Sequence, residues 1–417
     1  MSYATAKAAR FDNPSSVGPI VAAHPIGSSH GSADDGAPFA AISRWLFDDA
    51  LPFWREHGVD RLHGGFAEDL HLDGANRGSE FKRTRVQARQ IYVFAHAHLL
   101  GVSGARELAE HGYRFLVSKA WQGDHAGWAR KLTVDGRVLD PTPDLYDHAF
   151  VLFALSWLFR ATGEREVLDR CQATADFIEA HLRNTSGLGY VNALPASGPR
   201  LQNPHMHLLE AALSAFEATG HERYLKIADE IVTLFCDRLF DERTGTLPEH
   251  FDDLLLPLGG RGEATVEPGH HFEWAWLLSS YQRITGRDLR AYARALVGFA
   301  ERYGVDQRTG AVFAAVRNDG VSVDRSERIW PAAERLQAAV AMFELDRQSP
   351  MAVVTQSGNR LLQNHLAVTP AGAWMDQLSG DCAPKSSRIP ASTLYHLMVA
   401  FTEVLRIKDA ALGAAAK

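Results

Sequence analysis

The sequence predicts an all-α fold in which six helix hairpins close into a toroid, and three observations point to it. About twelve amphipathic segments follow one another from residue 38 onward, each with apolar residues at helical spacing. Short and long connections alternate between these segments. A unit of two helices recurs about every 61 residues, which is longer than the common solenoid repeats of roughly 34 to 47 residues. Six such units suit a closed ring.

The chain divides into three parts. Residues 1–36 are rich in Ser, Gly, Ala, Pro and Asp without sustained periodicity, so we expect a disordered N-terminal leader. Residues 37–410 should form a single barrel domain, and residues 411–417 a flexible C-terminal tail. The expected helices span residues 38–57, 82–100, 104–120, 145–162, 164–182, 204–219, 222–238, 269–285, 288–304, 330–346, 350–366 and 390–407.

The connections indicate the two ends of the ring. Short turns carry a glycine after the helix end, where left-handed backbone geometry favours it: Gly101, Gly163, Gly220 and Gly286. Long connections hold short β-like runs between turn residues, such as 137–139, 189–191 and 311–313. We expect short β-hairpins in these long loops, which should lie together on one side.

Composition argues against several classes of function. A formal charge of −7, with acidic and basic residues interspersed, speaks against nucleic-acid or anionic-membrane binding, because either needs a basic patch. No apolar run approaches the ~20 residues that span a bilayer. Only three cysteines occur, widely spaced and without a CxxC pair, so neither a disulfide framework nor a zinc–thiolate site is indicated. We therefore expect a cytoplasmic protein with a small, neutral partner.

A polar residue opens the second helix of each predicted pair. These residues lie 61, 61, 66, 61 and 62 positions apart: Arg85, Tyr146, His207, Glu273, Glu334 and His396. Six hairpins around one axis would bring these positions to one end of the ring, where the long loops would form a wall. The spacing therefore predicts a polar cavity on the axis.

The stretch 268–278 gives the sharpest local signal. Pro268 and Gly269 mark a helix start, and His270 and Glu273 lie three positions apart on one face. His271 lies about 100° round the helix and should point elsewhere. A core histidine held by a neighbouring carboxylate is the alternative interpretation.

Asn203 and His207 are four positions apart at another helix start and can face the same pocket. His205 and His207 lie about 200° apart and are poor joint metal ligands. Without an HExxH motif or cysteine ligands we expect no metal, and without a phosphate-binding or dinucleotide-binding glycine loop we expect no cofactor.

The remaining candidates have structural alternatives. Arg85 and Arg89 share one face of a helix too apolar to be exposed, so they need buried polar partners. Tyr146 and Trp330 fit a core role as well as a role in lining the cavity. Glu334 could pair with Arg335, and His396 alone could be a core histidine. Each of these candidates has a structural explanation by itself, and they indicate a site only when they are taken together.

At these residues the chain resembles the N-acylglucosamine 2-epimerase superfamily over about residues 38–407. The similar motifs are His63-Gly64-Gly65-Phe66, Arg85 with Gln87-Ala88-Arg89-Gln90, Tyr146-Asp147, Asn203 with His205-Met206-His207, Gly269-His270 with Glu273-Trp274, Trp330-Pro331 with Glu334, and Tyr395-His396-Leu397. The resemblance implies an (α/α)6 barrel. It also implies that His270 and His396 are the catalytic histidines, and that the sugar pocket is lined by Arg85, Asn203, His207, Glu273 and Glu334.

The resemblance and the chemistry together predict a cofactor-independent aldose–ketose isomerase acting on D-mannose and D-fructose through a cis-enediolate. Histidine suits proton transfer at a sugar C2 near neutral pH, and Arg85 could stabilise the oxyanion. We expect His396 to move the C2 proton, while His270 assists ring opening or protonates from the opposite side.

Three alternatives stay open. A sugar 2-epimerase would use the same two histidines, and a glycoside hydrolase on a similar toroid would use Glu273 and Glu334 as its carboxylate pair. A non-catalytic helical scaffold would not need polar residues on the axis. The sequence is compatible with a monomer and with a homodimer.

Overall fold

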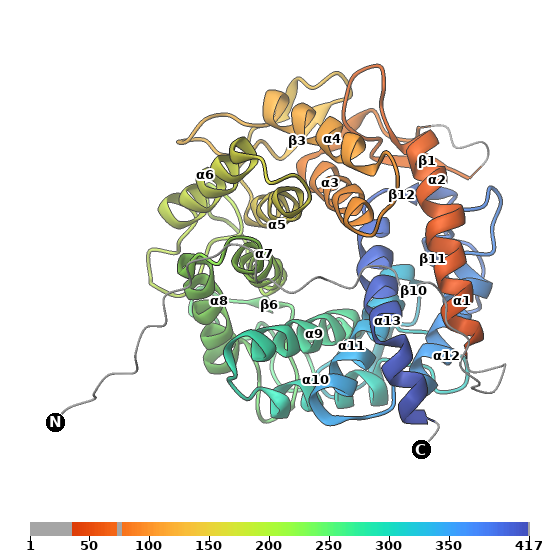
Figure 1. The fold of residues 1–417 in the computed structure, drawn as a ribbon. Helices are drawn as coiled ribbons and strands as arrows, with labels where there is room; N and C mark the ends of the chain where they lie inside the picture. The colour runs from red at the N-terminus through yellow and green to blue at the C-terminus, as the bar shows by residue number, and fades with distance from the viewer. Residues whose placement is uncertain (1–35, 73–76, 416–417) are drawn as a thin grey trace, which may run out of the picture. The chain divides into compact units, whose positions relative to one another are not determined.

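Twelve helical segments alternate between an inner and an outer ring in residues 36–72 and 77–415, the part of the chain that the computed structural model describes (Figure 1). The inner ring consists of α3 (Thr84–Leu99), α5 (Leu145–Thr162), α7 (Asn203–Thr219), α9 (Pro268–Thr285), α11 (Ile329–Asp346) and α13 (Thr393–Ala415). The outer ring consists of the segment from α1 (Ala37–Arg44) through α2 (Leu51–Phe53), α4 (Ala105–Lys119), α6 (Arg165–His181), α8 (Glu222–Leu234), α10 (Arg290–Tyr303) and α12 (Met351–Arg360). The predicted all-α toroid, an (α/α)6 barrel, is confirmed.

Burial separates the two rings. Inner helices are covered on all sides: in α11 every residue from Pro331 to Phe343 is buried. Outer helices bury one stripe only; in α8 the buried residues recur at helical spacing and the rest face solvent. Each inner helix packs against the next, and α13 packs against α3 to close the ring. The apolar periodicity of the sequence therefore reflects two kinds of environment, one for each helix of a hairpin.

Short turns join the inner helices to the outer helices at one end. Gly163, Gly220 and Gly286 end α5, α7 and α9 in left-handed geometry, with φ between 67° and 76°. Arg347 takes the same geometry after α11, at φ 58°. Because an L side chain seldom adopts this backbone conformation, the glycines predicted from the sequence are the residues that fit.

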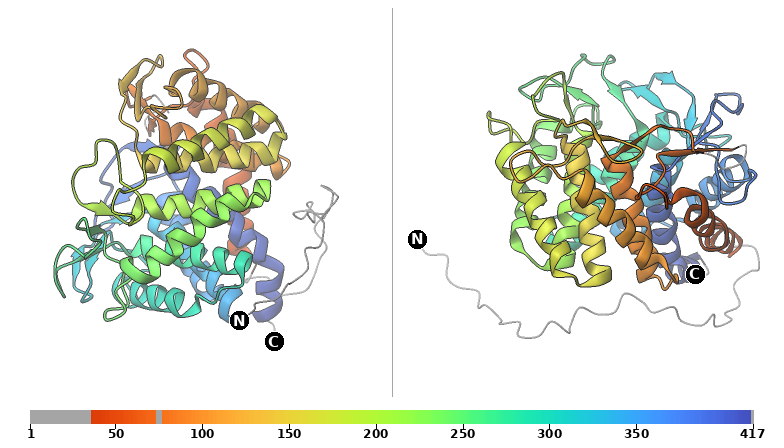
Figure 2. Two further views of the ribbon diagram at one scale, coloured as in Figure 1. Left: turned by 90° about the vertical axis from the view of Figure 1, so that its left-hand side faces the viewer. Right: turned by 90° about the horizontal axis from the view of Figure 1, so that it is seen from above.

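The long loops gather at the opposite end, where the inner helices begin (Figure 2). Two local hairpins form there as expected, β3 (Lys131–Thr133) with β4 (Val138–Asp140) and β8 (Ala315–Arg317) with β9 (Ser322–Asp324). The other pairings join separate loops: β1 (Asp69–His71) with β12 (Arg388–Pro390), β2 (Phe81–Arg83) with β3, β5 (Arg200–Leu201) with β6 (His250–Phe251), β7 (Thr265–Val266) with β8, and β10 (Glu327–Arg328) with β11 (Gln377–Leu378). The expected runs 189–191 and 311–313 form only isolated bridges, Arg183 with Tyr190 and Val305 with Val312.

The boundaries of the domain differ from the expectation at one end. The leader predicted for residues 1–36 lies outside the described residues, apart from Gly36. The C-terminal tail was predicted for 411–417, and of these residues 411–415 continue α13, with Ala411 fully buried. α13 packs against α1 and α12, and Ala411 belongs to the same buried core cluster as Val404 and Ile407. Among the described residues, no helix has both the length and the hydropathy that crossing a bilayer requires.

Gly269, in the first turn of α9, allows two inner helices to approach closely. A Cβ built at this position would lie 2.5 Å from the Trp330 ring and 3.0 Å from Pro331 of α11. Gly269→Ala should therefore lower the free energy of unfolding by about 1–3 kcal/mol, the usual cost of overpacking a filled interior. Chemical denaturation measures this change.

Gly298 provides the matched control, because it is exposed in the middle of α10 and a Cβ there would meet nothing within 4 Å. Gly298→Ala should raise the free energy of unfolding by about 0.5–1 kcal/mol, since alanine favours a helix over glycine. Equal effects of the two substitutions would contradict the close approach at Gly269.

Candidate active site

His270, in the first turn of α9, is held between a loop carboxylate and a side-chain amide of α7, the neighbouring inner helix. Its Nδ1 lies 2.9 Å from Glu249 Oε2, and its Nε2 lies 3.1 Å from Asn203 Nδ2. A second carboxylate, that of Glu267, lies 3.9 Å from the same Nδ1. Burial alone would lower the pKa of His270, but Glu249 and Glu267 outweigh it and raise the pKa to about 10. His270 is therefore an imidazolium at neutral pH.

His396, in the first turn of α13, has a different environment. Its Nδ1 lies 2.6 Å from Glu334 Oε1 of α11, and Gln337 donates to the other oxygen of that carboxyl group at 2.6 Å. Burial lowers the pKa of His396 well below its ordinary value, and the positive charge of Arg89 acts in the same direction. His396 is therefore neutral. When Nδ1 carries the hydrogen and donates a hydrogen bond to Glu334 Oε1, Nε2 is unprotonated and can act as a base.

The indole ring of Trp330 packs near both His270 and His396. Its ring centroid lies 5.1 Å from that of His270 and 5.6 Å from that of His396. The indole is partly exposed, whereas both imidazoles are buried, at 6% and 7% exposure. One aromatic surface at the loop end of the ring is thus flanked by a charged and a neutral histidine.

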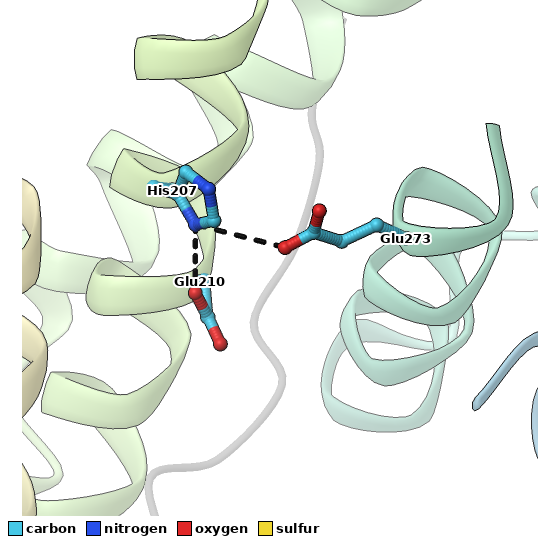
Figure 3. A group of neighbouring side chains, drawn as sticks. All are labelled: His207, Glu210 and Glu273. Carbon is cyan, nitrogen blue, oxygen red and sulfur yellow. Dashed lines mark hydrogen bonds and ion pairs between the residues drawn. The ribbon is translucent and has the colours of Figure 1, made fainter. Parts of the chain in front are cut away.

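A second polar group lies beside them, around His207 of α7 (Figure 3). His207 Nδ1 is 3.0 Å from Glu210 Oε2 and 3.7 Å from Glu273 Oε1 on α9. Tyr395 of α13 donates its hydroxyl hydrogen to Glu210 from the other side of the ring. Burial, with the nearby charge of Glu273, raises the pKa of Glu210 to about 8, and burial raises the pKa of Glu273 to about 7. Near pH 7, Glu210 is therefore mostly protonated and Glu273 is about half protonated.

Of the two arginines on this face of α3, Arg89 is buried and Arg85 is partly exposed. Arg85 is 23% exposed, and its guanidinium lies 3.5 Å from the Asp147 carboxylate. Arg89 forms no ion pair with any described residue; it donates to the Tyr146 hydroxyl at 2.8 Å and lies 4.1 Å above the Phe150 ring. An arginine that is buried without a carboxylate partner is available to an anion that forms in the site.

Four further histidines show what a structural histidine looks like in this protein. In His148, His205 and His271 one ring nitrogen accepts a backbone N–H of a long loop and the other donates to a backbone carbonyl. Burial lowers the pKa of each to about 4. His96, lower in the ring, bonds to the Tyr92 hydroxyl and its pKa is lowered to about 3 by burial. His271 thus points away from His270 and toward α10, through its bond to Leu296.

The structure places the predicted residues on all six inner helices, in one set of contacts at the loop end. Asn203 contacts His270, Trp330 contacts both catalytic candidates, Glu334 binds His396, and Tyr146 lies 4.9 Å from the His207 ring. Four further residues of this set were not proposed as site residues from the sequence: Arg89, Glu210, Glu249 and Tyr395. Arg89 was visible as the partner of Arg85 on one helix face, but Glu249 belongs to a loop and had no periodic signal.

Three groups have donor types and spacing that could hold a cation: His207 with Glu210 and Glu273, Glu249 with Glu267 and His270, and Glu273 with Glu334 and His396. In each group a histidine nitrogen faces a carboxyl oxygen at hydrogen-bond distance, so a shared proton accounts for the contact. The expectation that the site works without a metal stays a prediction.

Comparisons with known proteins show which family and which solved structures this chain is similar to. Residues 64–400 match the family model of N-acylglucosamine 2-epimerase (GlcNAc 2-epimerase). A mannose-6-phosphate isomerase of Rhizobium meliloti is 33% identical over 87% of this chain and 95% of its own length. A D-mannose isomerase of Thermobifida fusca is 31% identical over 80% of this chain and 88% of its own. A crystal structure of D-mannose isomerase superposes with a TM-score of 0.77 at 25% identity, covering 90% of this chain and 99% of the other.

The charge difference between histidines can be measured in the free protein. In protein labelled with [15N]histidine, we expect His270 to give the spectrum of an imidazolium at pH 7.5 and to keep it up to a pKa of about 10. His148, His205 and His271 should be neutral at the same pH, because burial lowers their pKa to about 4. The signal absent from His270→Gln identifies His270. Its titration near the ordinary value of about 6.5 would contradict the charged state.

Proposed function

We propose that this chain, which belongs to the N-acylglucosamine 2-epimerase family, interconverts D-mannose and D-fructose. It is an enzyme of the isomerase and epimerase class. The observation that carries the choice of reaction is the inequality of the two histidines on the axis: His270 is clamped by two carboxylates, and His396 is a neutral base with one. The relatives named for mannose and for its 6-phosphate support the choice of sugar.

His396 is the proposed base. Glu334 accepts its Nδ1–H and so directs the unprotonated Nε2 toward the substrate. In the open-chain aldose Nε2 removes the proton from C2, and the C2–H electron pair forms the enediolate double bond. The C1=O electron pair moves to O1, which takes up the proton that the 2-hydroxyl releases. The same imidazole, now protonated, returns its proton to C1 on the same face while the electron pair left on O2 forms the ketone, which gives the ketose. One base therefore completes the reaction and is restored.

His270 and Arg89 are the proposed electrophiles. The His270 imidazolium can give its Nε2 proton to the ring oxygen during ring opening and take up the proton that the anomeric hydroxyl releases, after which it donates a hydrogen bond to the carbonyl oxygen. Arg89, without a carboxylate partner among the described residues, can stabilise the negative charge that develops on the enediolate, an effect worth several kcal/mol in a site shielded from water. Asn203 and Trp330 both contact His270 and would help to orient the sugar.

A 2-epimerase would need both histidines to exchange roles. Epimerisation returns the proton to the opposite face of C2, and the reverse reaction then requires the second group to act as the base. A pKa of about 10 leaves very little neutral His270 near pH 7, so this residue can give a proton more readily than it can take one. The arrangement therefore favours the one-base isomerisation.

A phosphorylated sugar is the second candidate substrate, because one relative is named for mannose 6-phosphate. Binding a phosphate dianion typically uses unpaired cationic donors. Arg85 is paired with Asp147, and Arg89, enclosed by aromatic rings, is the donor already assigned to the enediolate charge. The described site therefore favours the unphosphorylated sugar.

A glycoside hydrolase requires one ionised carboxylate and one protonated carboxyl group beside the scissile bond. Burial raises the pKa of Glu273 to about 7, and it raises the pKa of Glu334 well above its ordinary value. Glu334 is also occupied by His396 and Gln337. Neither carboxyl group is placed to be a permanently charged nucleophile.

Incubation of the protein with D-mannose in deuterated water, followed by NMR of the products, tests the proposal. We expect fructose, with any solvent-derived deuterium at C1. Glucose labelled at C2 would show an epimerase instead. Parallel reactions with mannose 6-phosphate and with an aryl mannoside test the phosphorylated sugar and the hydrolase. Turnover of either of these, but not of mannose, would contradict the proposed substrate.

Substitutions separate the proposed base from its surroundings. His396→Asn should lower kcat by about 10²–10⁴-fold with little change in KM, because general base catalysis is lost while the sugar can still bind. Arg89→Met should lower kcat by about 10²–10³-fold. Arg85→Met is the matched control and should have a smaller effect, since Arg85 lies further toward solvent and is paired with Asp147. A larger effect of Arg85→Met would return the oxyanion role to Arg85.

A further inference from the structure

Glu249 is a buried loop carboxylate that no periodic pattern in the sequence identifies. It immediately precedes β6, which pairs with β5, so it lies beside Gln202 at the start of α7. Its backbone N–H donates to Thr265 at 3.0 Å, which ties it to the segment that leads into α9. The residue is 6% exposed. Two loop segments thus fix the backbone of Glu249 next to the first turn of α9.

The side chain of Glu249 accepts three hydrogen bonds. His270 Nδ1 and Gln202 Nε2 each lie 2.9 Å from Oε2, and the backbone N–H of Glu267 lies 3.1 Å from Oε1. Gln202 is fixed in turn, because its Oε1 accepts the indole N–H of Trp274 at 2.6 Å. The carboxylate therefore has one orientation, and that orientation sets the direction of the His270 ring.

We propose that Glu249 is a positioning residue of the isomerase: its bond to Nδ1 directs the Nε2–H of His270 toward the sugar and sets the pH range over which His270 acts as an acid. The proposal rests on the proposed function for its role in turnover. Its effect on His270 can be measured in the free protein.

The other side of the imidazole fits the same assignment. Asn203 Oδ1 is buried and has no partner among the described residues, while Asn203 Nδ2 faces His270 Nε2 at 3.1 Å. A half turn of the amide would place Oδ1 at Nε2, where it could accept the hydrogen of the charged ring. Glu249 would then hold one N–H of the imidazolium and Asn203 the other until a sugar oxygen replaces the amide.

Among the charged groups around His270, Glu249 does most to raise the pKa of the imidazole. Glu267 is further from Nδ1, at 3.9 Å, and its side chain is 38% exposed. Glu273 also favours the charged form, whereas burial opposes it. Five further titratable or charged groups interact with His270 or with Glu267: His207, His250, His271, Arg328 and His396. Among the charged groups of the described residues, Glu249 alone makes a direct hydrogen bond to a ring nitrogen of His270, while the neutral amide of Asn203 lies at the other nitrogen.

Glu249→Gln removes the charge and keeps the shape. In the free, [15N]histidine-labelled variant we expect the pKa of His270 to fall by roughly one to three units, the usual effect of losing an adjacent opposite charge. The alkaline limb of the kcat/KM profile with D-mannose should move down by the same amount. A two-unit shift would make the variant roughly tenfold less active than the wild type at pH 9, relative to their ratio at pH 6.

Two further variants separate charge from geometry. Glu267→Gln is the matched control and should shift the His270 titration by less, because Glu267 is more distant and more exposed. Glu249→Asp keeps the charge but shortens the side chain, so it should keep more of the raised pKa than Glu249→Gln while still lowering kcat. Thermal unfolding of all three variants reports any loss of stability.

The results distinguish three cases. An unchanged His270 titration in folded Glu249→Gln overturns the proposal. A lower pKa in that variant without movement of the alkaline limb overturns the role in turnover. A shifted titration in a protein that converts none of the sugars tested would support the Glu249 contact while contradicting the proposed function.

Discussion

The burial of charge on the axis of the inner ring is the constraint on which the rest of the structure depends. A charged or polar side chain there must find its partner on another helix or in a loop. Tyr395 of α13 donates to Glu210 of α7, and His396 of α13 bonds to Glu334 of α11. These contacts join helices distant in sequence. The ring must therefore close before the polar residues are satisfied, and the site exists only in the closed ring.

The direction of the inner helices adds a second effect. All six begin at the loop end, so their N-termini point toward the candidate site (Figure 2). Helix N-termini carry a partial positive charge, which favours an anion nearby. With the guanidinium of Arg89 and the imidazolium of His270, this potential suits a reaction that passes through an enediolate. The fold thus supplies part of the electrostatic stabilisation, and the side chains supply the rest.

The loops make two similar histidines chemically different. His396 pairs with Glu334 of the neighbouring helix, and the ring alone would provide that contact. His270 pairs with Glu249, which only the loop before β6 can deliver. Structural histidines such as His148 and His205 bond to backbone groups instead and remain neutral. The partner of an imidazole therefore decides whether it holds a loop in place, acts as a base or acts as an acid.

The sequence by itself determined the toroid, the alternation of short and long connections, and the helix faces that carry His270, Glu273, His207 and His396. These features follow from helical periodicity and from glycine geometry, which act over a few residues and recur in every repeat. Only the tertiary structure decided that Arg89 is buried while Arg85 is partly exposed, that α13 continues past residue 410, and that Glu249 holds His270. Each of these depends on contacts between elements far apart in the chain, such as the aromatic rings around Arg89 and the loop that brings Glu249 to α9, and no local pattern encodes such contacts.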